Sequence, residues 1–349
     1  MHRPPLRGLA APAALAALAT LVVAPTAGAV PKPPPGGSTA PAQVFAPNPV
    51  ADLGIQTLTD QKDADFFSAD PVLRQAYHRV TLTDLDGSGT LTGKYAVVSS
   101  ETGPPATDTG SGFIYTRDQD QFEQVMAYYW ITQAQRYIQS LGFGSTLPAV
   151  NKRQQAVRIN QFGGDNSFFR SGFKKLDITL GKGGVDDAED AEVIVHEYGH
   201  SVQDNQVPNF GSSLEAGAIG EAFGDYLAVT VSAAVAPTPD EACVADWDST
   251  SYTVDEPHCL RRVDGNKHYP EDLEGEVHAD GEIWSRALWD IRSALGARTA
   301  DTIIIRAQFG FTPDISMPAA AATTIKTAGL YGKRAENAVR AAFAARGLA

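Results

Sequence analysis

Residues 190–225 read DAEVIVHEYGHSVQDNQVPNFGSSLEAGAIGEAFGD. His196 and His200 stand four positions apart, so a helix presents both imidazoles on one face, where they can bind one metal ion. Glu197 lies on the same turn and can act as a general base. The pattern His-Glu-x-x-His therefore predicts two metal ligands and a base on a single helix.

Two helices are expected in and around this stretch. A capping-box pattern over residues 186–189 predicts the start of the first helix, which should end before Pro208. A second capping pattern over residues 212–215 predicts the start of the next helix, which carries Glu221. The two predicted metal ligands and a further carboxylate thus lie on consecutive helices.

A third ligand is expected from the second helix. A catalytic zinc site takes three protein ligands and leaves a fourth position open, and two histidines with one glutamate form such a set. Glu221 completes the set with His196 and His200, so we expect one Zn²⁺ per chain. Asp225, one turn after Glu221, can accept the second ring N–H of a ligand histidine and fix its tautomer.

HEYGH and the later EAGAIGEAFGDYLA together resemble the zinc site of the thermolysin-like and fungalysin-like metallopeptidases, and the fungalysin pattern is the closer. The metzincin pattern is excluded, because it needs glycine and histidine where this chain has Gln203 and Gln206. The resemblance implies an α+β, thermolysin-like two-lobed metalloprotease. Its mixed α/β lobe would span residues 76–205 and its mainly helical lobe residues 206–349, with the cleft at the HEYGH helix.

Residues 275–284, GEVHADGEIW, resemble the V-H-x-x-G-E-x-W segment of fungalysins. By this resemblance His278 donates a hydrogen bond to the oxyanion that forms during peptide hydrolysis. Thermolysin-like enzymes also use a tyrosine located between the second histidine and the glutamate ligand, and residues 201–220 contain none. Tyr252 or Tyr269 could take its place.

Two further segments resemble substrate-binding parts of thermolysin-like enzymes. NSFF, which begins at Asn166, resembles the edge segment that holds the substrate backbone, and this assigns substrate binding to Asn166 and Ser167. An ordinary polar loop is the alternative. Leu260 and Arg261 resemble the pair that walls the primed-side pocket, where Val193 would add an apolar surface. The alternative for Arg261 is an ion pair with a nearby carboxylate.

The first 29 residues combine Arg3 and Arg7 with an apolar run and small residues up to Ala29. This composition is typical of a secretory signal peptide that is cleaved near Ala29. A membrane anchor is the alternative, but the apolar run is short for a span. Residues 30–75 are expected to form a proline-rich N-terminal extension. No later stretch is expected to cross a membrane, so the mature chain should be secreted and not membrane-embedded.

The chain is acidic, with a formal net charge of −13 that becomes −15 when the two arginines of the signal peptide are lost. Nucleic acid is therefore not an expected partner. Cys243 and Cys259 are the two cysteines, and they predict one disulfide in an oxidising compartment. The Asp-rich turn at residues 84–89 leaves Ca²⁺ open without indicating it, because an EF-hand loop would need glutamate at Tyr95. A monomer is expected.

Together these residues predict a secreted zinc-dependent endopeptidase that acts on proteins or peptides, with Glu197 as general base and His278 as oxyanion stabiliser. One alternative is a non-catalytic secreted protein that keeps the zinc scaffold, which the loss of Glu197 or of a ligand would mark. Both are intact. The other alternative is an aminopeptidase of the same zinc class, which needs an acidic anchor for the substrate amine, such as Glu215 or Glu276.

Overall fold

The computed structural model describes residues 37–58, 71–171 and 176–349. The predicted signal peptide lies outside these ranges. In chain order the elements are β1 (Ser38–Val44), α1 (Pro49–Leu53), η2 (Leu73–Ala76), β2 (His78–Leu85), β3 (Ala96–Ser100), α2 (Asp120–Ser140), β4 (Gln155–Ile159), β5 (Phe168–Arg170), β6 (Asp177–Thr179), η3 (Asp187–Glu189), α3 (Ala191–Gln206), α4 (Leu214–Val235), β7 (Cys243–Val244), η4 (Asp248–Ser251), β8 (Arg261–Arg262), α5 (Val277–Leu295), α6 (Ala297–Gln308), α7 (Met317–Gly329) and α8 (Lys333–Ala344).

A two-stranded antiparallel sheet of β1 and β2 begins the first lobe. Val44 and Phe45, at the end of β1, are fully buried in the main apolar core. Pro41 is tolerated in the strand because it lacks only an N–H, and its carbonyl still accepts from the N–H of Phe113 at 2.8 Å. The described part of the extension expected at residues 30–75 therefore contributes to the core of this lobe.

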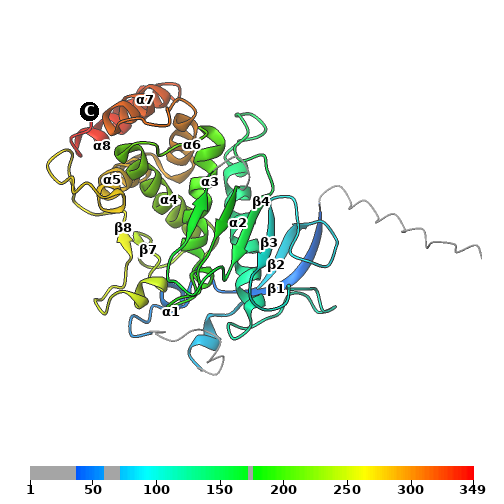
Figure 1. The fold of residues 1–349 in the computed structure, drawn as a ribbon. Coiled ribbons are helices and arrows are strands. Elements are labelled where there is room, and N and C mark those ends of the chain that lie inside the picture. The colour runs from blue at the N-terminus through cyan, green and yellow to red at the C-terminus, as the bar shows by residue number, and fades with distance from the viewer. Residues whose placement is uncertain (1–36, 59–70, 172–175) are drawn as a thin grey trace, which may run out of the picture. The chain divides into compact units, whose positions relative to one another are not determined.

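A four-stranded sheet in the order β3-β4-β6-β5 forms the centre of the first lobe (Figure 1). β3, β4 and β6 are parallel, and β5 is an antiparallel strand at the edge. Val157 and Ile159 of β4 are buried at alternating positions, as the period of a strand requires. The long helix α2 packs against β3, β1 and α3, and its Trp130 is fully buried.

Helices α3 and α4 both begin later than the capping patterns predict. α3 begins at Ala191 because the carboxylate of Asp190 accepts the N–H of Glu192 at 2.9 Å. Residues 186–189 instead contain the separate single turn η3. α4 begins at Leu214, where Ser213 is the cap. These shifts leave the spacing within each helix unchanged. His196 and His200 therefore still share one face of α3, and Glu221 and Asp225 still share one face of α4.

The second lobe consists mainly of helices α4 to α8, and α4 packs between α3 and α5 (Figure 1). One connected apolar cluster includes residues from Ala40 to Leu348, so the two lobes share a core. In the part of the chain that the structure describes, α4 alone is long and apolar enough to cross a membrane, contrary to the expectation that no later stretch would be. However, 78% of its apolar window is buried inside the protein, as in a core helix.

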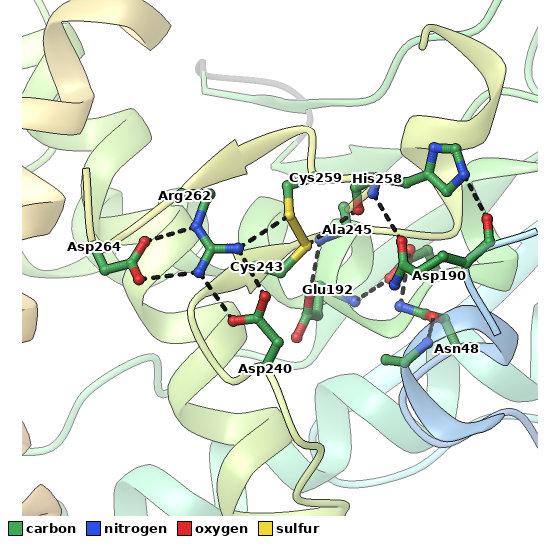
Figure 2. Close-up of a disulfide and its surroundings, with 12 residues drawn as sticks. Asn48, Asp190, Glu192, Asp240, Cys243, Ala245, His258, Cys259, Arg262 and Asp264 are labelled. Atoms are coloured by element: carbon green, nitrogen blue, oxygen red, sulfur yellow. Dashed lines mark hydrogen bonds and ion pairs between the residues drawn. A yellow bond between two sulfur atoms is a disulfide. The ribbon is translucent and has the colours of Figure 1, made fainter. Parts of the chain in front are cut away.

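The predicted disulfide between Cys243 and Cys259 is present, which confirms the cysteine pairing (Figure 2). Beside it, the guanidinium of Arg262 lies between the carboxylates of Asp240 and Asp264, with N–O distances of 2.7–3.0 Å. The preceding His258 contacts the carbonyl of Gln56 through Nε2 at 2.7 Å. The irregular segment after α4 is therefore cross-linked internally by the disulfide, and it is hydrogen-bonded to the N-terminal part of the fold through His258.

Candidate active site

A cavity of about 710 Å³ lies along α3, and its lining residues come from both lobes. His196, His200 and Glu221 all line it. On α3 the two histidines are one helical turn apart, and their Nε2 atoms lie 3.2 Å from each other. Glu221 of α4 reaches across with both oxygens, at 3.1 Å from Nε2 of His196 and 3.5 Å from Nε2 of His200. We call these three residues the ligand cluster.

The geometry of the ligand cluster fits a zinc ion. Ligand atoms at about 2.0–2.1 Å from a tetrahedral zinc lie roughly 3.3 Å from one another. Here the two Nε2 atoms lie 3.2 Å apart, and each has an oxygen of Glu221 nearby, Oε2 at 3.1 Å from His196 and Oε1 at 3.5 Å from His200. Two imidazoles and a carboxylate are also donors that zinc accepts in catalytic sites. The predicted ligands therefore come together at distances that a single zinc ion could bridge.

Two glycines allow α3 and α4 to approach closely enough for this contact. A Cβ on Gly199 would lie 2.9 Å from the Cα of Gly224, and a Cβ on Gly224 would lie 2.7 Å from Nδ1 of His196. Both separations are shorter than side chains tolerate, so larger residues would push the helices apart. The glycines of HEYGH and EAFGD thus have a packing role that the sequence analysis did not assign.

Asp225 lies next to the ligand cluster and contacts His196. Its Oδ1 is 2.8 Å from Nδ1 of His196, which directs Nε2 of the same ring toward Glu221. Arg261 donates to both oxygens of Asp225, at 2.7 Å each. Of the two predictions for Arg261, the ion pair is therefore present, although the residue also lines the cavity.

Basic and acidic side chains alternate from Arg261 through Asp225 and His196 to Glu221. Their pKa values are shifted by these neighbouring charges and by burial. Burial would raise the pKa of Asp225, but Arg261 and His196 outweigh it and lower the value to about 2. Burial would likewise raise the pKa of Glu221, but the histidines hold it well below its usual range. Burial would lower the pKa of His196, yet the two carboxylates raise it to about 10. Burial lowers the pKa of His200 to about 4.

Glu197 lies beside the ligand cluster, but no ion pair joins it to a described residue of that cluster. One of its carboxylate oxygens lies within 4.8 Å of a ring nitrogen of His196 and of His200. Its Oε2 is buried and has no hydrogen-bond partner in the described part of the chain. Burial raises its pKa to about 7, although the charge of His196 opposes the shift. A carboxylate with this pKa can take up and release a proton near neutral pH.

His278 is at the start of α5 and reaches the same cavity. Its Nε2 lies 3.2 Å from Oε2 of Glu221, and half of its side chain is exposed. Glu276 caps α5 by accepting the N–H groups of His278 and Ala279, and it also contacts Nδ1 of His278 at 2.7 Å. Glu276 therefore orients the imidazole, a role that a capping residue two positions before the histidine could have suggested.

Asn166 and Ser167 line the cavity next to the edge strand β5. An edge strand has unpaired backbone groups that can bind an extended peptide. Ser167 has an additional contact that the sequence did not indicate, because its hydroxyl donates to Oδ2 of Asp187. The hydroxyl of Tyr252, a predicted substitute for the missing tyrosine, donates to Asp165 at 2.6 Å.

The remaining candidates are not among the described residues that line the cavity. Tyr269 does not line it, and its hydroxyl is 3.4 Å from Glu215. Glu215 accepts the N–H of Met317 at 2.6 Å, and neither Glu215 nor Glu276 is among the described residues that line the cavity. The two carboxylates considered as anchors for a substrate amine are thus engaged elsewhere.

Val193 and Leu260 line the cavity, as the resemblance implies, but the wall is not simply apolar. Asp165, Asp187 and Asp248 line it as well, and one oxygen of each lies within 4.8 Å of the others. We call these three residues the acidic pocket. They come from three separate segments, so no local pattern in the sequence indicated that they meet.

Comparisons with known proteins agree with this geometry. Residues 111–304 match the fungalysin metallopeptidase (M36) family. The chain is also similar to the structure of the precursor of protealysin, a metalloproteinase from Serratia proteamaculans, with 16% identity and a TM-score of 0.53. That likeness covers 76% of this chain and 92% of the other, and it concerns the fold. No curated protein matches the chain. The predicted α+β, thermolysin-like fold is confirmed.

Proposed function

Because the chain belongs to the fungalysin family of metallopeptidases, we propose that it is a zinc-dependent endopeptidase that cleaves internal bonds of proteins or peptides. The observation that carries this proposal is the convergence of His196, His200 and Glu221 within 3.5 Å, with the carboxylate of Glu197 beside them. A metallopeptidase needs a metal and a base in this relation.

We assign the metal to the ligand cluster, with Asp225 holding the ring of His196. Zinc, when bound, supplies Lewis acidity that polarises the substrate carbonyl and makes water acidic near pH 7. Arg261 keeps Asp225 ionised through its two N–H donors at 2.7 Å. A neutral Asp225 would accept more weakly from His196, so Arg261 supports the metal site indirectly.

We assign the role of general base to Glu197. Its unpartnered Oε2 would accept a proton from the attacking water and later donate that proton to the nitrogen of the leaving amine. A pKa of about 7 balances these two steps, because the group must be deprotonated at the start and protonated in between. Burial, which raises the pKa, also keeps bulk water from competing for the proton.

His278 would donate from Nε2 to the oxygen that becomes negatively charged in the transition state. Its Nε2 lies 3.2 Å from Glu221, and its half-exposed side chain lines the cavity. Glu276 holds the opposite ring nitrogen, and this contact keeps Nε2 directed toward the cavity. Asn166 and the backbone of Ser167 would bind the substrate main chain in an extended form beside β5.

The protein would act outside the cell, after cleavage of the signal peptide near Ala29, and as a monomer. The disulfide between Cys243 and Cys259 is consistent with an oxidising compartment. No specific observation favours the non-catalytic alternative, since Glu197 and the three residues of the ligand cluster all line one cavity. The aminopeptidase alternative is weakened because Glu215 and Glu276 do not line the cavity.

The test uses one peptide that is acetylated at its N-terminus and amidated at its C-terminus. We expect cleavage at internal bonds, loss of activity with a zinc chelator, recovery with Zn²⁺ and one zinc per chain by metal analysis. Stoichiometric zinc without cleavage of any peptide would support the non-catalytic alternative. Removal of single residues only from peptides with a free amine would support the aminopeptidase.

A further inference from the structure

The acidic pocket lies in the same cavity as the ligand cluster but is a separate group of side chains. Asp165 precedes β5, Asp187 begins η3 and Asp248 begins η4. Asp187 and Asp248 are only 3% and 4% exposed. The three carboxylates nevertheless line a cavity that is open to a ligand. Buried carboxylates this close together are unusual without a partner that offsets their charge.

Two of the three carboxylates are held by hydroxyl groups, and two oxygens are left without partners. Tyr252 donates to Oδ1 of Asp165 at 2.6 Å, and Ser167 donates to Oδ2 of Asp187. Oδ1 of Asp187 and Oδ1 of Asp248 are buried and have no hydrogen-bond partner in the described part of the chain. An unsatisfied buried carboxylate oxygen is costly, so these atoms indicate where a ligand's donor groups would bind.

Within the described ranges, the acidic pocket has no basic side chain in direct contact with it. Among the described residues, no lysine or arginine forms an ion pair with any of the three carboxylates, and Arg261 is committed to Asp225. Burial, reinforced by the charge of Asp165, raises the pKa of Asp187 to about 7. Burial and the neighbouring carboxylates also hold the pKa of Asp248 well above its usual range. A cation from outside would stabilise the ionised form of both.

We propose that the acidic pocket binds the positively charged side chain of a substrate lysine or arginine next to the bond that is cut. This inference rests on the proposed function, because it names the residue that the same cavity prefers. An ammonium group has three N–H donors, and three acceptors at about 2.8 Å in tetrahedral directions lie roughly 4.6 Å apart. The three carboxylates each have an oxygen within 4.8 Å of the others, so they are close enough to accept from one ammonium group together. Val193 and Leu260 could contact the aliphatic part of the side chain.

A calcium ion is the other ligand that three carboxylates suit. It takes six to eight oxygen ligands, mostly at fixed short distances. Here one oxygen of Asp165 and one of Asp187 already accept hydrogen bonds from hydroxyl groups. An ammonium needs only three acceptors, and a guanidinium can use several carboxylates at once. The charged side chain therefore fits the available oxygens better, and calcium binding becomes an outcome of the test.

The experiment uses end-blocked peptides with a single cleavable bond. Two sets place lysine, ε-acetyl-lysine, leucine or glutamate immediately before or immediately after that bond. Acetyl-lysine keeps the length of lysine and removes its charge. We expect lysine to exceed acetyl-lysine in kcat/KM by roughly 10- to 100-fold in one of the two sets, which is the usual strength of a hydrogen-bonded charge. Equal or better cleavage of the acetyl-lysine and leucine peptides in both sets would overturn the proposal.

Substitutions connect the preference to the pocket. Asp248→Asn should lower the ratio of lysine to acetyl-lysine cleavage by roughly tenfold, because one charged acceptor is lost. Asp255→Asn is the matched control, since Asp255 is exposed in the segment after η4 and does not line the cavity, and it should leave the ratio unchanged. If Asp248→Asn does not fold, Asp165→Asn at the less buried carboxylate provides the same comparison. An unchanged ratio in the folded variant would contradict the proposal.

Two measurements separate this proposal from the proposed function. Calorimetry on the zinc-loaded Glu197→Gln protein compares binding of uncleaved lysine and acetyl-lysine peptides, so a preference can be seen without turnover. Tighter binding of lysine with no cleavage by the unmodified protein would retain the acidic pocket and refute the peptidase. Metal analysis in added Ca²⁺ gives the other outcome: a second ion per chain that Asp248→Asn loses would overturn the inference.

Discussion

The acidic pocket and the group around Asp225 are both buried and rich in carboxylates, yet their pKa values move in opposite directions. The pKa of Asp225 falls to about 2, because Arg261 and His196 outweigh its burial. The pKa of Asp187 rises to about 7, because its burial and the charge of Asp165 outweigh the hydrogen bond from Ser167. The two residues are both 3% exposed, so burial itself does not distinguish them.

At equal burial, therefore, the charge of the neighbouring side chain decides whether the pKa of a carboxylate falls or rises. The Asp225 carboxylate stays ionised well below neutral pH, because its charge is paired with those of Arg261 and His196. Asp187 and Asp248 can still gain a proton or a cation. The first arrangement suits a permanent structural charge, and the second suits recognition of a ligand.

The largest expected loss of activity comes from substitution of Glu197. This residue lies beside the ligand cluster, but its pKa is raised, as are those of Asp187 and Asp248 in the acidic pocket. Glu197→Gln keeps the volume and the metal ligands and removes the base. We expect kcat to fall by roughly 10³- to 10⁴-fold, the upper range for general base catalysis, with one zinc per chain retained. Steady-state kinetics with metal analysis check this. A kcat within tenfold of the unmodified protein would exclude Glu197 as the base.

His278 should give the next largest effect. His278→Ala should lower kcat by roughly 10²- to 10³-fold with less effect on KM, because one oxyanion donor is lost. Glu276→Gln should cost only about tenfold, since it leaves the imidazole in place and weakens its orientation. The same kinetics distinguish the two, and zinc content should be unchanged in both. A near-normal kcat for His278→Ala would mean that another group supports the oxyanion.

A matched pair of substitutions compares a buried carboxylate whose pKa is lowered by ion pairs with one whose pKa is raised by burial. Asp225→Asn removes the ion-pair partner of the buried guanidinium of Arg261. Zinc affinity should therefore fall by roughly 10- to 100-fold and unfolding free energy by about 3–5 kcal/mol. Asp246→Asn removes a carboxylate of similar burial whose pKa is raised by burial to about 8. It should leave the unfolding free energy unchanged or higher at pH 8. Chemical denaturation and zinc titration measure both, and equal losses would refute the distinction.

The smallest effect is a pH dependence of stability. Burial raises the pKa values of Asp187, Asp190 and Asp246 to about 7, 6 and 8. The folded protein therefore binds these protons more tightly than the unfolded chain, and the stabilisation is complete below about pH 4 and lost as the pH rises through 6–8. We expect a higher Tm near pH 5 than near pH 8, with a difference on the order of 1 kcal/mol per group. Asp246→Asn should reduce the difference, with metal content kept constant.

Spacing along helices was enough to predict which side chains of the ligand cluster meet. His196 and His200 share one helix, and Glu221 and Asp225 share the next, so only the packing of two consecutive helices had to be correct. The disulfide followed from the presence of just two cysteines. The first prediction depends on residues that are close in the sequence, and the second on a cysteine that has only one other cysteine to pair with.

Other features depend on contacts between distant segments, which one sequence does not encode visibly. The pairing of Arg261 with Asp225 requires the β7–β8 hairpin to lie against α4. The acidic pocket combines three segments that have no common periodicity. The strand β1 was hidden by the proline-rich sequence around it, which suggested an extended tail. The carbonyl of Pro41, the one proline of the strand, still forms a strand-like hydrogen bond.

The apolar core that both lobes share has a consequence for how activity is lost. Lobes with separate cores can melt one at a time, whereas a common core makes their unfolding cooperative. α3 and α4 run through the middle of this core, so amide protons of the HEYGH helix should exchange with solvent only when the whole molecule opens. Thermal inactivation would then follow global unfolding, and stabilising substitutions anywhere along the core, even in α8, would lengthen the working life of a catalytic site in α3.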